Sequence, residues 1–449
     1  LSVNRTIMRT SWVVILCLLP LRLWAQSPET SIHEKMEWFQ EAKLGNFIHW
    51  GIYSVNVIDE SWSFFNNYIS HEDYLKQLDG FTAKKYDPDH WAELMREAGA
   101  QYAVITTKHH DGIALWDSKK GGLNTYEHAA AKKDLLTPFV KALRKENMKV
   151  GLYYSLPDWS YADYDRHTRT VARYKIGEDQ RRWGKFLDYY QGQLGELANL
   201  YNPDLWWFDG DWEHSADEWQ AGKVRSMLLE KNPDAIINSR LRGEGDYETP
   251  EQGPPVVRPD APYWELCLTM NDSWGFQHND KNYKSPMQVI EILVDCIIKG
   301  GNLLLDIGPK ADGTIPDEQV HILQELGKWT GKHREAIYGS RAGIPYEHFY
   351  GPTALSRDST ILYLFVKGDQ GGQLTLKGIS NKINRIWVVG NGTKLNHKVM
   401  SKVYWNKYPG LLYVDLPEDV LDPYYTVVAV HLDGPVRLFR EKSKAVESN

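Results

Sequence analysis

The 449 residues are enough for two or three domains, or for one large domain and a smaller one. With 42% hydrophobic and 25% charged residues, the composition is that of a globular protein and excludes a disordered chain, a collagen and a simple coiled coil. The formal net charge of −7 leaves no basic footprint for non-specific nucleic-acid binding. The 18 Trp and 26 Tyr suit a large core, and aromatic faces also pack on sugar rings.

Residues 1–25 have the pattern of a signal peptide. Two arginines precede an apolar run, residues 12–19, which is too short to span a bilayer, and Ala25 fits a cleavage site. No later stretch has the length and apolarity of a membrane span. We therefore expect an exported protein, periplasmic or secreted. Its remaining cysteines, Cys267 and Cys296, lie in apolar surroundings and are expected to be buried free thiols, with a single disulfide as the alternative.

Short apolar runs alternate with amphipathic stretches over most of the chain. The runs, which predict strands, cover residues 45–51, 102–110, 149–155, 204–210, 235–240, 263–268 and 302–308, and the helical stretches cover 87–100, 134–147 and 181–201. Such alternation predicts parallel strands, and polar or aromatic residues end each run, as at the mouth of a (β/α) barrel. No GxGxxG turn of a doubly wound sheet follows the first run. We predict a (β/α)8-like (TIM-type) barrel over residues 26–345.

The pattern changes after residue 345. Short alternating runs with turn residues between them predict an antiparallel β-sandwich over residues 346–449. The sequence identifies no exposed aromatic site of the kind that a lectin needs. We therefore expect the sandwich to pack against the barrel in a structural role.

Side chains at the predicted mouth suggest two kinds of site. Asp209 follows the buried run LWWF, where burial and neighbours tune a carboxyl pKa, although an Asp before Gly also caps turns. His49, His109 and His110 follow other runs and could bind zinc or donate hydrogen bonds to a hydroxylated substrate. Adjacent histidines on a strand face opposite sides, so both members of the pair reach the mouth only if the strand has ended. Without an HxH or HExxH pattern the second interpretation fits better, and a zinc-dependent barrel hydrolase remains the alternative.

A hydrolase that splits a glycosidic bond needs two carboxyls, and two glutamates could be the partner of Asp209. Glu251 lies in a loop rich in Pro and Gly, and Glu265 lies inside an apolar run. A loop carboxyl can lean over a leaving group, whereas a strand-end carboxyl is more often fixed by a neighbour such as Arg240. The residues alone separate these candidates only weakly.

Together the motifs resemble glycoside hydrolase family 29, the α-L-fucosidases, over about residues 33–435. The landmarks in chain order are WFQEAKLGNFIHWG, SWSFFNNYISHEDY, YAVITTKHHDGIALWDS, VGLYYSLPDW, LWWFDGDWEH, INSRLRGEGDYETPEQ, YWELCLTMNDSWGF and KGGNLLLDIGPKADGTIP. The TKHHDG, WFDGDW and GGNLLLDIGP segments are specific in combination.

This resemblance implies a retaining exo-glycosidase that removes terminal α-L-fucose from glycans or glycoconjugates without a cofactor. The sequence does not indicate an oligomeric state. It implies that Asp209 is the nucleophile, and it favours Glu251 over Glu265 as the acid/base. The residues that it assigns to fucose are His49, Glu60, Trp62, His109, His110, Tyr154, Trp207 and Arg240. The alternatives are an exo-glycosidase of other specificity and a binding protein on an inactive barrel, and the presence of both carboxyls argues against the latter.

Overall fold

The computed structural model describes residues 28–441 apart from 369 and 406. The predicted signal peptide lies outside these residues. Within the described part, no helix is both long enough and apolar enough to cross a membrane. Cys267 and Cys296 are both buried and unpaired, which confirms the expectation of free thiols.

Seven parallel strands form the wall of the predicted barrel and confirm its fold class. They are β1 (Leu44–Ile48), β2 (Tyr102–Lys108), β5 (Lys149–Ser155), β6 (Leu205–Asp209), β7 (Ile236–Ile237), β8 (Glu265–Leu268) and β9 (Asn302–Ile307), in the order β7-β6-β5-β2-β1-β9-β8. Two short strands, β3 (Ile113–Ala114) and β4 (Leu123–Asn124), extend the sheet beside β2. Every predicted run overlaps one of the seven strands, because buried parallel strands are apolar on both faces.

The gap between β7 and β8 is closed by the irregular segment 247–252. Parallel bridges pair its Tyr247 with Asn238, its Glu248 with Trp264 and its Glu251 with Cys267. Backbone hydrogen bonds of 2.9 to 3.1 Å link this segment to residues 263–267. The segment therefore takes the eighth position in the wall, and Glu251 lies near its C-terminal end rather than in a free loop.

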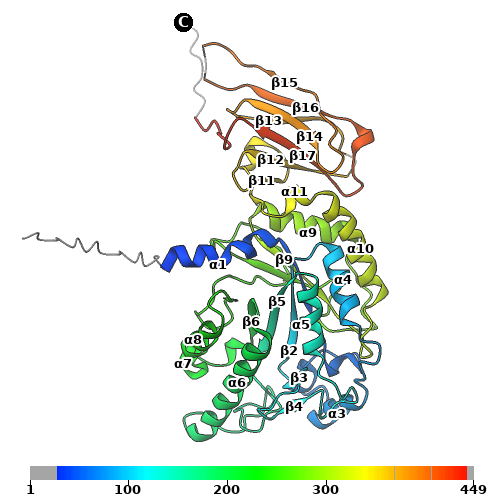
Figure 1. Ribbon diagram of the computed structural model, residues 1–449, viewed down its shortest axis with the longest axis vertical. Helices are drawn as coiled ribbons and strands as arrows, with labels where there is room; N and C mark the ends of the chain where they lie inside the picture. The colour runs from blue at the N-terminus through cyan, green and yellow to red at the C-terminus, as the bar shows by residue number, and fades with distance from the viewer. Residues whose placement is uncertain (1–27, 369, 406, 442–449) are drawn as a thin grey trace, which may run out of the picture.

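Helices cover the outside of the wall (Figure 1). The long ones are α4 (Pro88–Ala98), α5 (Leu136–Lys145), α6 (Gln180–Tyr201), α8 (Ala221–Lys231), α9 (Pro286–Ile298) and α10 (Asp317–Lys332), and the short ones are α2 (Trp62–Phe65), α3 (His71–Leu75), α7 (Ala216–Trp219) and α11 (Arg334–Ile337). The predicted start of α4 is explained by Asp87, whose side chain accepts the His90 N–H, and α4 stops at Gly99, where φ is +102°.

The inside of the barrel has a core separate from the layer between strands and helices. Its wall residues are Phe47, Tyr102, Val104, Tyr153, Leu205, Trp207, Ile236, Tyr247, Cys267 and Leu304. Helix α1 (Pro28–Ala42) adds Met36, Phe39 and Ala42 to this cluster. The Phe39 ring lies 4.5 Å from that of Tyr247 and 5.9 Å from that of Tyr102, so α1 closes the N-terminal end of the barrel.

The C-terminal region is an antiparallel sandwich, as predicted. One sheet has the order β10 (Arg341–Ala342), β11 (Thr353–Leu355), β12 (Ile361–Lys367), β17 (Tyr425–Leu432), β14 (Ile383–Val388), and the other has β13 (Gly372–Lys377), β16 (Leu411–Leu416), β15 (His397–Met400). The five-stranded sheet packs on the barrel helices, where Trp329 Nε1 of α10 donates to the Tyr425 carbonyl at 3.0 Å. Figure 1 shows the sandwich on the α1 side of the barrel, whereas β3 and β4, beyond the C-terminal end of β2, lie at the other end. The mouth therefore faces away from the sandwich.

Candidate active site

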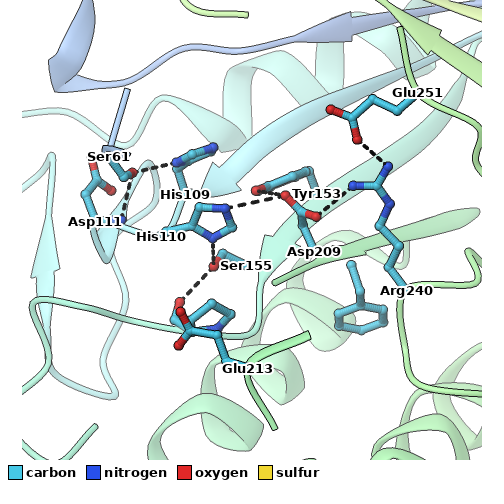
Figure 2. A network of polar contacts seen from close by, with 12 residues as sticks. Ser61, His109, His110, Asp111, Tyr153, Ser155, Asp209, Glu213, Arg240 and Glu251 are labelled. Atoms are coloured by element: carbon cyan, nitrogen blue, oxygen red, sulfur yellow. Dashed lines mark hydrogen bonds and ion pairs between the residues drawn. The ribbon is translucent and has the colours of Figure 1, made fainter. Parts of the chain in front are cut away.

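Asp209, the last residue of β6, lies at the centre of a network of polar contacts (Figure 2). Its Oδ1 accepts a hydrogen bond from Arg240 Nη1 at 2.9 Å, its Oδ2 accepts one from the Tyr153 hydroxyl at 2.9 Å, and His110 Nε2 lies 3.5 Å from Oδ2. Burial by itself would raise the pKa of Asp209, but the Arg240 guanidinium, His110 and the two hydrogen bonds lower it below its ordinary value. The carboxyl is therefore ionised at neutral pH, as a nucleophile must be.

Arg240, just after β7, connects Asp209 to Glu251. While Nη1 donates to Asp209, Nη2 donates to Glu251 Oε2 at 2.6 Å, so that one guanidinium holds both carboxylates. Its Nε donates to Thr249 Oγ1 at 3.1 Å, and the guanidinium lies 4.6 Å from the centre of the Trp207 ring. The Glu251 side chain is 41% exposed and that of Asp209 only 12%. The site thus combines one fixed, sheltered carboxylate with one that is open to solvent.

The three predicted histidines converge beside Asp209, and the protein holds the Nδ1 atom of each. The contacts are His49 with Asp306 Oδ1 at 2.7 Å, His109 with Ser61 Oγ at 2.5 Å and His110 with Ser155 Oγ at 2.6 Å. Because β2 ends at Lys108, strand alternation does not separate His109 from His110, and their ring centres are 4.3 Å apart. Burial lowers the pKa of His109 well below its ordinary value and that of His110 to about 4, the latter opposed in part by Asp209. Both imidazoles are therefore neutral at neutral pH.

The predicted residues Glu60 and Trp62 lie on the other side of the histidines. Glu60 is 3% exposed, its Oε1 accepts the Gly275 N–H at 2.6 Å, and burial raises its pKa well above the ordinary value. The Trp62 ring lies 5.5 Å from that of His110 and is nearly parallel to Trp212 at 6.3 Å. Trp62 therefore lines the site, whereas Glu60 fixes the loop that carries Gly275.

Adjacent tyrosines near the end of β5 face opposite sides of the wall, and this corrects one prediction. The Tyr154 hydroxyl donates to Gln193 Oε1 of α6 at 2.8 Å, in the layer between the barrel and the helices. Tyr153 points into the barrel, where it donates to Asp209 and stacks on Trp207 at 5.6 Å. The prediction of Tyr154 as a pocket residue is thus wrong by one position, and Tyr153 occupies the site instead.

Trp207 forms the floor of the site, and Glu265 lies beneath it. Trp207 Nε1 donates to Glu265 Oε1 at 3.0 Å, and the Tyr102 hydroxyl donates to Oε2. Glu265 has no exposed surface, and burial raises its pKa to about 7 against these hydrogen bonds. It touches the edge of the indole, whereas Arg240 lies over the ring face. The structure therefore does not bring Glu265 to the mouth as the predicted second catalytic carboxyl.

Besides Tyr153, three residues of the site were missed by the assignments made from the sequence. The Trp274 ring lies 4.8 Å from that of His49, and Trp212 is 47% exposed with its ring 5.9 Å from that of His110. Asp306, which anchors His49, is buried, and burial raises its pKa to about 6. The sequence contained features that could have identified them, since Asp306 ends an apolar run and both tryptophans lie within the landmark motifs DSWGF and FDGDW.

The side chains do not favour the zinc-dependent alternative. Across residues 28–441, with the two gaps noted above, no three His, Cys, Asp or Glu side chains are grouped so that they could hold a metal ion. The Nδ1 atoms of His49, His109 and His110 are instead bound to an Asp and two Ser side chains. The arrangement suits hydrogen bonding to a substrate.

The chain is similar to known proteins in both sequence and fold. A family model described as Alpha-L-fucosidase matches residues 24–335. Tissue alpha-L-fucosidase of Macaca fascicularis is 29% identical over 91% of this chain and 92% of its own length. Alpha-L-fucosidase isoenzyme 1 of Paenibacillus thiaminolyticus superposes with a TM-score of 0.81 at 31% identity, covering 90% of this chain and 100% of that one. A GH29 alpha-L-fucosidase of Bacteroides thetaiotaomicron (TM-score 0.78, 27% identity, 89% and 96% covered) was solved as a covalent intermediate with 2-fluoro-fucosyl fluoride in a glutamate-to-glutamine variant.

Proposed function

The chain belongs to the α-L-fucosidase family, glycoside hydrolase family 29, and from this premise we propose how its own residues carry out the reaction. It is a retaining fucosidase, since the covalent intermediate trapped in the Bacteroides relative is the hallmark of double displacement. One observation carries the assignment of roles, namely that a single arginine, Arg240, holds both Asp209 and Glu251.

In the first step Asp209 attacks the anomeric carbon, and protonated Glu251 gives its proton to the departing oxygen. The bond from this carbon to the leaving oxygen breaks as the ester to Asp209 forms. In the second step Glu251 takes a proton from water, which attacks the same carbon and releases L-fucose and the Asp209 carboxylate. Arg240 faces one carboxylate charge throughout, on Asp209 before the first step and on Glu251 after it, so its own charge stays balanced while the ester exists.

Burial and access support Glu251 over Glu265 as the acid/base. An acid/base must reach both the leaving group and incoming water, and the side chain of Glu251 is open to solvent. Glu265 is enclosed by Tyr102 and Trp207 with both oxygens occupied. We assign Glu265 the task of positioning the Trp207 indole, on which Arg240 rests.

For the fucosyl group we propose a pocket of imidazoles over an aromatic floor. The Nε2 atoms of His49, His109 and His110 hydrogen-bond the sugar hydroxyls, since the protein already holds each Nδ1. The ring of Trp62 takes the apolar ring face and the methyl group. Trp207, which is 2% exposed and has Tyr153 and Arg240 against its ring, supports the pocket from beneath. The substrate is accordingly a fucosylated oligosaccharide or glycoconjugate.

We also propose that the protein is exported and acts in a periplasm or outside the cell. The support is the pattern of residues 1–25 alone. Expression of the full chain, followed by sequencing of the mature N-terminus, tests this. Cleavage after Ala25 is the expected result, and an uncleaved chain that stays in the cytoplasm contradicts export.

Hydrolysis of 4-nitrophenyl α-L-fucoside, with and without azide, tests the catalytic roles. Azide needs no base and can replace water on a fucosyl-enzyme. We expect Asp209→Ala to be inactive and Glu251→Ala to regain turnover with azide and form fucosyl azide. Glu265→Ala, the matched loss of a carboxyl that lies buried beneath Trp207, should show no azide response. Rescue of Glu265→Ala instead would move the acid/base there.

A further inference from the structure

The sandwich carries a groove at the edge of its smaller sheet, far from the barrel mouth. Strand β15 is the edge strand, and its register puts His397 and Val399 opposite the buried Val414 and Leu412 of β16, on the face toward the sandwich core. Yet every residue of β15 is exposed, because the opposing sheet does not cover this strand. The uncovered face borders a cavity of about 500 Å³.

The cavity is lined mainly by polar and positively charged groups. Lys382, Lys402 and Arg437 are its cations and Asp433 is its one acid. Asp433 is already paired with Arg437 at 3.0 Å. Within the described residues no ion pair involves Lys382 or Lys402. On a chain with a net charge of −7, this groove therefore offers unneutralised positive charge.

Two aromatic side chains lie on the turn that joins β15 to β16, in the stretch between Lys402 and Pro409, which both line the groove. Tyr404 is 96% exposed and Trp405 is 67% exposed, and their rings are nearly perpendicular, 4.8 Å apart. Val399 and Met400 of the same hairpin are each 49% exposed. Large apolar side chains exposed together on one hairpin mark an interaction site more often than they stabilise the fold.

We infer that this groove, with Tyr404 and Trp405 at its rim, is a second carbohydrate-binding site that takes an acidic polysaccharide. Indole and phenol faces pack on the C–H faces of sugar rings, and the ammonium and guanidinium groups bind sulfate or carboxylate substituents. A neutral glycan uses the rings alone, whereas the excess of cations selects a charged one. Because the sandwich lies on the opposite side of the barrel from the mouth, this site anchors the enzyme without occupying the catalytic pocket.

Native gel electrophoresis of the intact protein through dextran sulfate, polygalacturonate or neutral dextran tests the inference. We expect the sulfated or the uronate polymer, or both, to retard the wild type, and neutral dextran to leave it unretarded. Tyr404→Ala/Trp405→Ala and Lys382→Ala/Lys402→Ala should each weaken binding at least about tenfold, equivalent to about 1.4 kcal/mol. The matched control Tyr346→Ala/Tyr350→Ala removes another exposed aromatic pair of the same domain and should bind like the wild type.

Each contrary outcome overturns the inference. Absence of retardation by both acidic polymers removes the site, and retardation that survives Tyr404→Ala/Trp405→Ala means diffuse charge attraction. If sedimentation shows that the wild type is a dimer and that Tyr404→Ala/Trp405→Ala is not, the exposed side chains form a contact between copies of the chain. Binding to anionic lipid vesicles without binding to either polymer makes it a membrane contact. All variants should keep wild-type hydrolysis of the aryl fucoside, because none lies near Asp209, so a failure of this inference leaves the catalytic assignment untouched.

Discussion

Removal of the positive charge of Arg240 should move the acid limb of the pH–rate profile. Arg240 is the main influence that lowers the pKa of Asp209 against burial. Arg240→Met removes a charge-assisted hydrogen bond of about 1.5–3 kcal/mol, and at 1.36 kcal/mol per unit the pKa of Asp209 rises by about one to two units. Since Asp209 must be ionised to attack, the acid limb of kcat/KM, which reports the free enzyme, moves to higher pH by the same amount.

The assay is kcat/KM for 4-nitrophenyl α-L-fucoside from about pH 3 to pH 8. Arg240→Lys keeps a charge but lacks the planar fork whose two Nη atoms reach the two carboxylates, so we expect a smaller shift of the limb together with a reduced plateau. Arg242→Met is the matched control, because Arg242 bonds to the backbone oxygens of Asp211 and His214 and not to Asp209. If the acid limb of the kcat/KM profile of Arg240→Met lies at the same pH as in the wild type, the electrostatic argument is refuted, whatever the plateau value of kcat/KM in this variant.

Three further predictions concern groups around the same site. Burial raises the pKa of Glu265 to about 7, so its stabilising contribution is complete below the unfolded pKa and is lost as the pH rises through 7. Urea unfolding should show that the wild type loses about 2.5 kcal/mol relative to Glu265→Gln between pH 5 and pH 8. Tyr153→Phe should lower kcat/KM about tenfold by removing one hydrogen bond to a charged group, while Tyr154→Phe on the outer face changes it less than about twofold. Gly210→Ala should abolish most activity, because φ is +80° and a Cβ would lie 2.2 Å from Pro157 Cδ.

Each of these has a clear contrary result. Equal stability differences at the two pH values would mean that Glu265 is not held neutral by burial. Equal kinetic losses in the two tyrosine variants would remove the distinction between the inner and outer faces of β5. Wild-type rates in Gly210→Ala would show that the turn after the nucleophile relaxes without moving it.

Much of the barrel was predictable because parallel strands leave long apolar runs that turn residues interrupt. The same property hid the orientation of the tyrosines. Strands buried on both faces have no polar and apolar alternation, so the sequence KVGLYYS contains nothing that assigns Tyr153 or Tyr154 to the inside. Only the pairing of β5 with β6, which puts Tyr153 beside Trp207, decides it.

The eighth position of the wall escaped prediction for the opposite reason. Segment 247–252, with the sequence YETPEQ, has no apolar run and contains a proline, so it has the composition of a loop. Its pairing depends on the backbone of residues 263–267, which is a tertiary effect. The motif resemblance favoured Glu251 without this knowledge, whereas the choice between Glu251 and Glu265 gains its physical basis from burial.

The two proposed catalytic carboxyls, Asp209 and Glu251, lie on parts of the barrel wall that differ in stiffness. Asp209 ends a strand that is paired on both sides. Glu251 belongs to segment 247–252, which isolated bridges hold, and in the described part of the chain no helix occurs between β7 and β8. An irregular segment held by isolated bridges opens locally at lower free-energy cost than a continuous strand covered by helices. We therefore expect strict discrimination of the fucosyl group, which binds beside Asp209 at the end of β6. We expect tolerance toward leaving groups of different bulk, because segment 247–252, which carries Glu251, can adjust to them.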